Sequence, residues 1–315
     1  MIPPERLEAE KAKVIAAAGP WTAHNIQLAD GVYTMRAAIA GDEIKLRRIT
    51  QAIADVARRP LRELRVLDLA CLEGLYGIEL ARHGAEVVAV EARAANLAKA
   101  RFAKDALGLT TLTLLQEDVR TVSLATHGAF DVVLCLGILY HLDAPDVFTL
   151  VGRVAELCRG FALFDTHVSL TAETVHTHAG HTYAGRRVRE HGDDATEAEK
   201  AARLLASLDN PMSFWPTAPS LYNLLRHAGF TSVWECHLPP EPEKPIDRTT
   251  LLAIKGVSQP LLSAPLMSAA AVEDVPEVSR RRGITEPAPS FRALRAAARR
   301  LPRPVKRWLR SLAGR

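Results

Sequence analysis

The stretch VLDLACLEGLYG, residues 66–77, combines residue types that can bind a nucleoside or a phosphate. An apolar run ends in an acid, Asp68, and a turn containing glycine follows. In open α/β sheets such a turn lets a ligand approach the backbone, and an acid about 20 residues further on binds ribose hydroxyls. Glu91 lies 23 residues after Asp68, at the end of the next apolar run. The spacing therefore predicts a nucleoside-binding loop.

This turn differs from the usual loop, which has three glycines, because Ala70 and Leu72 stand where two of them would be and Gly74 alone remains. An alanine costs little where φ is negative, whereas a leucine with positive φ is strained. We therefore expect the loop to take a wider path. A third acid, Asp118, follows the next apolar run, where a carboxylate can accept a hydrogen bond from an adenine amino group.

Tyr140 and His141 follow the fourth apolar run and are candidate catalytic residues. A histidine at that position can remove a proton from an acceptor hydroxyl, and a well-placed base accelerates such a step by ~10²–10⁴-fold. The alternative is a histidine that caps the next helix or packs on it.

Asp165 and His167 end the fifth run and are two residues apart, so in an extended segment they share a face. They could orient a base or hold a hard metal ion, but no third ligand has matching spacing, and we predict no metal. The alternative is a turn at the end of a strand.

Residues 167–215 are polar and rich in histidine, and we interpret them as a lid over the substrate. The His-x-His-x-x-His spacing at 176–181 is compatible with zinc, yet no cysteine or acid nearby would complete a closed site. Arginines suit anionic acceptors, and two aromatic side chains could stack on a sugar or base. The predicted substrate residues of this segment are Tyr183, Arg186, Arg187 and Trp215. The alternative is a solvated helical hairpin.

The elements that must position these residues alternate along the chain. Helical patterns at 3–18 and 42–58 precede apolar runs that alternate with helices from residue 65, including a helix at 146–160. The runs TSVWECHL and RTTLLAIKG follow each other without a helix, which indicates an antiparallel edge pair. We predict an α/β, Rossmann-like fold with a doubly wound, mostly parallel sheet of seven strands.

The three spaced acids, Gly74, FDVVLCLGILYHLDAP and the final TLLAIKG resemble a class I S-adenosylmethionine-dependent methyltransferase over roughly residues 60–257. LGILYHLDAP and NPMSFWPTAPSLYNLLRHAGF are most similar to the group containing the tRNA wobble-uridine oxyacetate methyltransferases. The resemblance implies S-adenosylmethionine as cofactor. It implies a binding site built from Asp68, Ala70, Gly74, Glu91, Ala92, Asp118, Val119, Leu136 and Gly137. With the turn composition, it also implies that Trp21, His24 and Asn25 close the other side of the pocket.

We divide the chain into an N-terminal helical cap (1–59), the methyltransferase domain (60–257), a linker (258–290) and a basic tail (291–315). The four cysteines lie far apart in apolar surroundings, which favours reduced thiols in a cytoplasmic protein. No apolar run is long enough for a membrane span, and the N-terminus has no secretory pattern.

The net charge of +4 hides a division, because residues 289–315 carry nine basic residues and no acid, which leaves 4 − 9 = −5 for residues 1–288. An apolar stripe between the arginines of 291–315 predicts an amphipathic helix on an anionic membrane surface, at the inner membrane face. The alternatives are an RNA-binding arm or a simple charged tail.

These features predict an enzyme that methylates a hydroxyl of a small molecule, sugar or glycan, with a histidine base. A tRNA-modifying methyltransferase is the first alternative. A non-catalytic nucleoside-binding module that has lost the loop glycines is the second.

Overall fold

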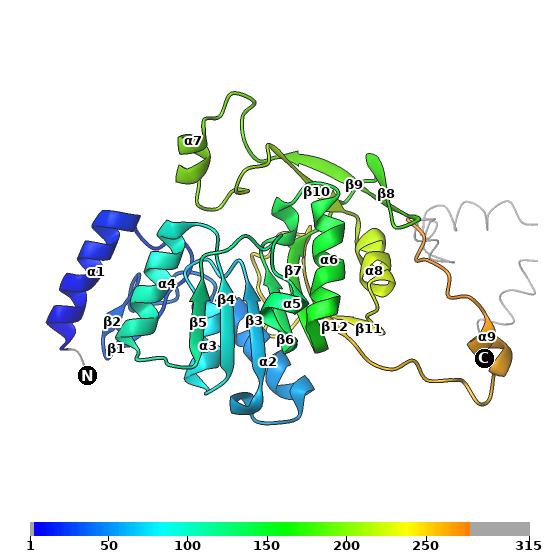
Figure 1. Cartoon of the computed structure of the whole chain (residues 1–315), viewed down its shortest axis with the longest axis horizontal. Helices are drawn as coiled ribbons and strands as arrows, with labels where there is room; N and C mark the ends of the chain where they lie inside the picture. Colours follow the sequence, from blue (N-terminus) through cyan, green and yellow to red (C-terminus); the bar gives the residue numbers. More distant parts are fainter. Residues whose placement is uncertain (1–2, 278–315) are drawn as a thin grey trace, which may run out of the picture. The chain divides into compact units, whose positions relative to one another are not determined.

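The computed structural model describes residues 3–277, and its central element is a seven-stranded sheet (Figure 1). The strand order is β11-β12-β7-β6-β3-β4-β5, with β3 to β7 parallel and β12 antiparallel to both β7 and β11. This confirms the predicted fold class, including the edge pair. The strands are β3 (Arg65–Leu69), β4 (Glu86–Val90), β5 (Leu112–Leu115), β6 (Phe130–Leu136), β7 (Cys158–His167), β11 (Ser232–Glu235) and β12 (Arg248–Ile254).

Both faces of the sheet are buried, which explains why the strands are apolar at nearly every position. Successive side chains alternate between the faces, so that Leu67 and Leu69 pack with α6 (Asp146–Leu157) and α8 (Ala218–His227). Val66 packs on the other face with α2 (Glu43–Ala57) and α3 (Leu75–Arg82). The helix predicted over 146–160 is too long by three residues, because Cys158 already pairs with Phe130 as the first residue of β7.

The N-terminal segment contributes to the same core. It contains α1 (Pro4–Ala18), a short hairpin of β1 (Gln27–Ala29) and β2 (Val32–Tyr33), and α2. Leu7, Ile49 and Ile53 are almost fully buried against one face of the sheet. The remaining elements before the lid segment are η1 (Leu61–Glu63), α4 (Ala94–Ala106), α5 (Leu124–His127) and η2 (Leu139–His141).

The segment predicted as a lid forms a three-stranded antiparallel sheet of order β10-β9-β8, next to α6 and α8 (Figure 1). Its elements are β8 (Thr174–His178), β9 (His181–Arg189), α7 (Glu197–Ala202) and β10 (Met212–Pro216). The alternative of a helical hairpin is therefore wrong. Ala179 and Gly180 both have positive φ, which makes a two-residue hairpin turn between β8 and β9.

The chain divides into a unit of residues 1–275 and a second unit from 276 onward. Within the predicted linker, the described part contains the short helix α9 (Pro265–Ala269). The basic tail, 291–315, and the predictions of a membrane or RNA contact made for it lie outside the described residues. Among the helices of residues 3–277, none is both long and apolar enough to cross a membrane. All four cysteines are free thiols.

Candidate active site

A cavity of about 290 Å³ lies where the carboxyl ends of β3, β4, β5 and β6 meet. Ligands of open α/β sheets bind at that edge of the sheet. The predicted cofactor residues that line it are Asp68, Ala70, Glu91, Ala92, Asp118, Val119, Leu136 and Gly137. Gly74 is outside the lining and forms the N-cap of α3 with φ 88°. A side chain there would meet Ala100 and Ile78 at 3.1 and 3.2 Å and would be strained by the positive φ, so glycine is favoured at this position of the turn.

The loop after β3 keeps left-handed conformations without the usual glycines. Ala70 and Leu72 both have φ of 52°, so the expected wider path is wrong. Hydrogen bonds hold the turn in place: Leu72 N donates to Glu91 Oε2 (3.0 Å), and Cys71 N donates to Val90 O (2.9 Å). The surrounding contacts thus offset a cost of about 1–2 kcal/mol per left-handed residue.

Asp68 and Glu91 bring two buried carboxylates to the cavity. Asp68 Oδ2 accepts from Gly77 N at 3.0 Å, and burial raises the pKa of Asp68 to about 7. Glu91 accepts from Leu72 N and from Arg93 N (2.8 Å), and burial raises its pKa above the ordinary value. Each carboxylate has more acceptor positions than these bonds use, so a ligand with hydroxyl or ammonium donors fits between them.

Asp118 also lines the cavity but is already paired. Its two oxygens accept from Arg120 Nε and Nη2 at 2.6–3.1 Å, and Arg120 Nη2 also lies 2.7 Å from Asp209. Hydrogen bonds from Arg120 overcome the effect of burial and hold the pKa of Asp118 below its usual value. At this end of the cavity the acid therefore anchors Arg120 and, through it, Asp209.

Tyr140 and His141 lie on η2 and line the cavity. His141 Nδ1 is 3.0 and 3.1 Å from the two carboxylate oxygens of Glu190, a buried residue that sequence reasoning missed. Burial acts to raise the pKa of Glu190, but hydrogen bonds from His141 and Ser207 hold it below the ordinary value. An ionised Glu190 keeps the proton on Nδ1 and makes Nε2 the acceptor. This is the arrangement of a histidine base and its orienting acid.

Asp165 and His167, which were expected to orient a base or hold a metal ion, do not line the cavity. Asp165 is fully buried and accepts from Arg248 Nε (2.7 Å) and Thr250 Oγ1 (2.7 Å). His167 Nδ1 lies 3.0 Å from Asp247, and its Nε2 lies 3.5 Å from Arg248 Nη1. Both residues therefore hold Arg248, whose side chain does line the cavity.

A charged group at the β6 end of the cavity also escaped the sequence analysis. Asp42, Lys45 and Arg248 line it, with Lys45 Nζ 3.0 Å from Asp42 Oδ2 and 3.6 Å from Asp165 Oδ1. Tyr76 donates to Asp42 at 3.2 Å. Asp42 and Lys45 come from the start of α2, where their spacing of three was the available signal.

The predicted N-terminal wall is only partly correct. His24 lines the cavity, but its Nδ1 accepts from Leu75 N at 3.1 Å, and burial lowers its pKa to about 4. Trp21 is buried against Phe102 and does not reach the cavity. Asn25 also lies outside the lining and donates to Ala38 O at 2.8 Å.

Glu73, in the loop after β3, ties this N-terminal loop to the cofactor side. Its carboxylate accepts from Thr22 N (2.7 Å) and His24 N (3.0 Å), and it pairs with Lys99 Nζ at 3.1 Å. The side chains of Glu73 and Lys99 are both fully buried. The loop after β3, in which Ala70 and Leu72 stand in place of glycines, therefore also holds residues 22–24 through Glu73.

Residues 200–210 close another side of the cavity. Arg93 donates to four carbonyl oxygens of this segment, with distances of 2.8–3.2 Å, on Lys200, Ala201, Ala206 and Ser207. Ser207 N donates to Glu190 at 2.9 Å, and Asn210 Nδ2 donates to His141 O at 3.0 Å. The segment thus connects Arg93, beside the predicted ribose acid, with the histidine and its orienting acid.

Four predicted substrate residues lie outside the cavity lining: Tyr183, Arg186, Arg187 and Trp215. Strand pairing directs Tyr183 at α6, where it is 1% exposed and stacks on Phe148 (5.0 Å between centroids). Arg187 pairs with Asp143 at 2.6 Å. Arg186 lies over the ring of Trp215, whose Nε1 donates to Tyr140 O at 2.8 Å. Trp215 thus holds η2 through Tyr140, Arg187 holds Asp143 just after η2, and none of the four side chains lines the cavity.

Comparison with known proteins agrees with this geometry. A family model described as "Methyltransferase domain" matches residues 66–160. The ubiquinone biosynthesis O-methyltransferase of Sodalis glossinidius is 32% identical over 147 residues, which is 46% of this chain and 58% of that protein. A protein of the same name from Cereibacter sphaeroides (strain ATCC 17023) is 29% identical over 196 residues, which is 60% of this chain and 71% of that protein.

Among solved structures, the N-terminal domain of EvdMO1, determined in the presence of SAH and D-fucose, has a TM-score of 0.61. It is 23% identical, and the match covers 81% of this chain and 97% of that domain. The chain spans a little more than half the length of the first curated relative, and the tRNA-modifying group is not among these proteins. The matched family, the strand order and the paired acids at the strand ends agree on one conclusion. Residues 66–160 match a methyltransferase domain, and they lie in the Rossmann-like fold that the resemblance to class I S-adenosylmethionine-dependent methyltransferases implies.

Proposed function

We propose that the chain transfers a methyl group from S-adenosylmethionine to a hydroxyl of a polar small molecule or sugar, with His141 as general base. The observation that carries this proposal is the pairing of His141 with the buried carboxylate of Glu190 beside the cavity. An oxygen nucleophile must lose a proton on methylation, so a base with a fixed tautomer suits a hydroxyl acceptor. The curated relatives are named as O-methyltransferases, which supports an oxygen acceptor.

The residues around the cavity suit this cofactor. Glu91 would accept hydrogen bonds from the ribose hydroxyls, and Asp68 would face the amino group of the methionine part. Burial raises the pKa of both acids, so donors supplied by a ligand would replace the water that they have lost. When bound, S-adenosylmethionine supplies an electrophilic methyl group on a positively charged sulfur.

The acceptor belongs at the other end of the cavity. A ligand that runs from Asp118 past Glu91 to Gly137 ends near Tyr140 and His141. The acceptor hydroxyl would give its proton to His141 Nε2 as its oxygen bonds to the methyl carbon and the carbon–sulfur bond breaks, which leaves S-adenosylhomocysteine. Correct alignment alone can contribute ~7–11 kcal/mol to lowering the barrier.

The charged side chains at this end favour a polar acceptor over an apolar one. Asp42 can accept from hydroxyls, while Lys45 and Arg248 can donate to hydroxyl or carboxylate oxygens. A sugar or a hydroxy acid presents such groups, whereas a hydrocarbon surface would displace water from these charged side chains without offering them a hydrogen bond. This supports the sugar or small-molecule acceptor expected from the sequence.

The test is methyl transfer by the purified chain from labelled S-adenosylmethionine to a panel of monosaccharides, nucleotide sugars, hydroxy acids and tRNA. With an acceptor found, His141→Gln should lower kcat by ~10²–10⁴-fold and leave S-adenosylhomocysteine binding unchanged. Glu190→Gln should lower kcat less and shift its pH profile, while His237→Gln, on an exposed histidine, serves as control. Labelling of tRNA alone, or an unchanged kcat in His141→Gln, would contradict the proposal.

A further inference from the structure

A group of histidines lies on the hairpin of β8 and β9, away from the cavity. The register pairs His176 with Tyr183 and His178 with His181, and cross-strand partners share one face of a sheet. That face covers α6 and α8, because Tyr183 stacks on Phe148 and His181 stacks on His227 at 3.6 Å between ring centroids. The strand register therefore brings His181 to the C-terminal end of α8.

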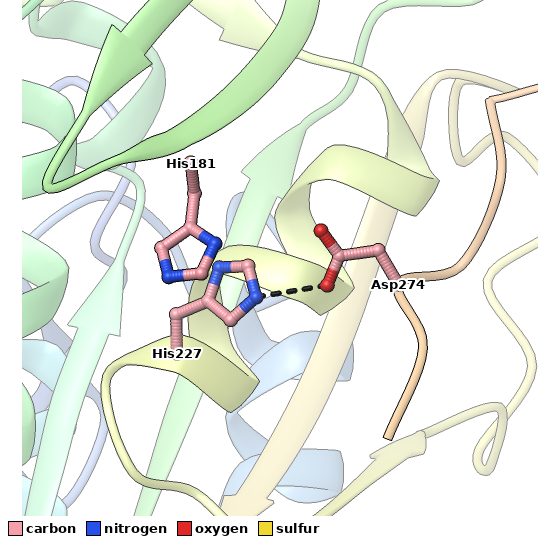
Figure 2. Close-up of side chains that lie close together, drawn as sticks. All are labelled: His181, His227 and Asp274. Atoms are coloured by element: carbon pink, nitrogen blue, oxygen red, sulfur yellow. Dashed lines mark hydrogen bonds and ion pairs between the residues drawn. The ribbon is translucent and has the colours of Figure 1, made fainter. Parts of the chain in front are cut away.

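Asp274, which follows α9, completes a group of three potential metal ligands with His181 and His227 (Figure 2). Asp274 Oδ1 lies 2.8 Å from His227 Nε2, and one ligand atom from each residue lies within 4.8 Å of the others. In a tetrahedral zinc site with bonds of ~2.0–2.2 Å, ligand atoms are roughly 3.3–3.6 Å apart. The group therefore closes around an ion after a shift of about 1–1.5 Å.

Two contacts position the ligands independently of any ion. The hydroxyl of the buried Tyr183 lies 2.8 Å from His227 Nδ1, which leaves Nε2 directed at Asp274. Metal-binding histidines generally have such a partner on the second ring nitrogen. Asn223 accepts from Val275 N (2.8 Å) and donates to Val275 O (2.9 Å), which fixes the backbone beside Asp274.

The guanidinium group of Arg226 already occupies the space between His227 and Asp274. Arg226 Nη2 contacts Asp274 Oδ1 and lies 2.9 Å from His227 Nε2. The side chain of Arg226 is about one third exposed, so it can turn into solvent. His181 is exposed and can turn its ring from the stacked position toward Asp274 without disturbing the core.

We propose that His181, His227 and Asp274 form a site for a divalent transition metal ion, with Zn²⁺ as the best match for two imidazoles and one carboxylate. Arg226 is the resident cation that the ion displaces. None of the three ligands lines the cavity, so the ion has no part in methyl transfer. Its effect is to fasten the segment around Asp274 to α8 and β9.

The test uses the full chain without a polyhistidine tag, titrated with Zn²⁺ by calorimetry and with Co²⁺ by visible absorption. We expect one ion per chain, and binding weaker by ~10–100-fold in Asp274→Asn, which changes an exposed side chain. His227→Gln should act similarly, and its unfolding midpoint reports whether it folds. Arg226→Gln should bind the ion at least several-fold more tightly because the competing cation is gone.

Hydrogen exchange gives a second measurement, since Zn²⁺ should slow exchange around residues 272–275 in the wild type but not in Asp274→Asn. His237→Gln, on an exposed histidine elsewhere, should behave as the wild type. Absence of Zn²⁺ binding, or full-strength binding in Asp274→Asn, would overturn the proposal. Unchanged affinity in Arg226→Gln would overturn the displacement of Arg226.

Discussion

Asp68→Asn is predicted to stabilise the ligand-free protein at alkaline pH, although it removes a carboxylate from the proposed cofactor site. Asp68 is 1% exposed, and burial raises its pKa from 3.8 to about 7, with the charge of Glu91 acting in the same direction. The Gly77 N–H opposes the shift but does not cancel it. Asparagine has no charge to bury and retains an oxygen that can accept from Gly77 N.

The sign and size of the effect follow from the two pKa values. Between pH 4 and 7 the folded chain keeps a proton on Asp68 that the unfolded chain has lost, so the free energy of unfolding falls as the pH rises. A shift from 3.8 to about 7 spans roughly three units at about 1.4 kcal/mol each. The ionised Asp68 thus costs at most about 4 kcal/mol above pH 7.

The assay is urea unfolding without cofactor at pH 5 and pH 8, with Asp105→Asn on an exposed residue of α4 as the matched control. The variant should be more stable than the wild type by roughly 1–2 kcal/mol at pH 5 and by up to about 4 kcal/mol at pH 8. S-adenosylhomocysteine should stabilise the variant less than the wild type. A difference between variant and wild type that is the same at both pH values would refute the reasoning.

Three further predictions concern the segments around the cavity. Leu72→Gly should change the free energy of unfolding by less than about 1 kcal/mol in urea, since the relief of backbone strain is offset by the larger conformational entropy of the unfolded chain. Leu72→Val should lower it clearly, because a branched side chain tolerates the left-handed φ poorly. Equal effects of the two variants would contradict the left-handed φ. Lys99→Met should lower the free energy of unfolding by about 3–5 kcal/mol, because Glu73 stays buried without its counter-charge, and adding Glu73→Gln should recover part of that loss; urea unfolding of both single variants and the double variant measures the two effects. Arg93→Gln should speed hydrogen exchange in 200–207 and weaken S-adenosylhomocysteine binding; unchanged exchange would exclude Arg93 as the anchor of this segment.

The sheet and the position of the acids at its edge could be predicted because they depend on local pattern. Apolar runs alternating with helices specify a parallel sheet, and acids at the ends of those runs, such as Asp68 and Glu91, must meet at one edge of it. The left-handed φ of Leu72 could not be predicted, because it depends on hydrogen bonds that the loop N–H groups donate to Val90 O of the neighbouring strand and to Glu91.

The pairing of Glu190 with His141 was also beyond the sequence. The two residues are 49 positions apart, and their contact depends on how β9 and β10 are placed over η2. Tyr183 shows the same limit in the opposite direction. The sequence around Tyr183 did not show that this residue lies on a strand. The strand β9 directs the Tyr183 side chain at α6, away from the cavity.

The most direct test of the central claim is calorimetric titration of S-adenosylhomocysteine into the full chain and into Glu91→Gln. The account predicts one site with a dissociation constant on the order of micromolar, and binding at least ~10-fold weaker in Glu91→Gln because a charged acceptor of hydrogen bonds is lost. Asp105→Asn should bind as the wild type does. No binding by the folded wild-type chain would contradict the assignment of this cavity to S-adenosylmethionine and, with it, the proposed methyl transfer.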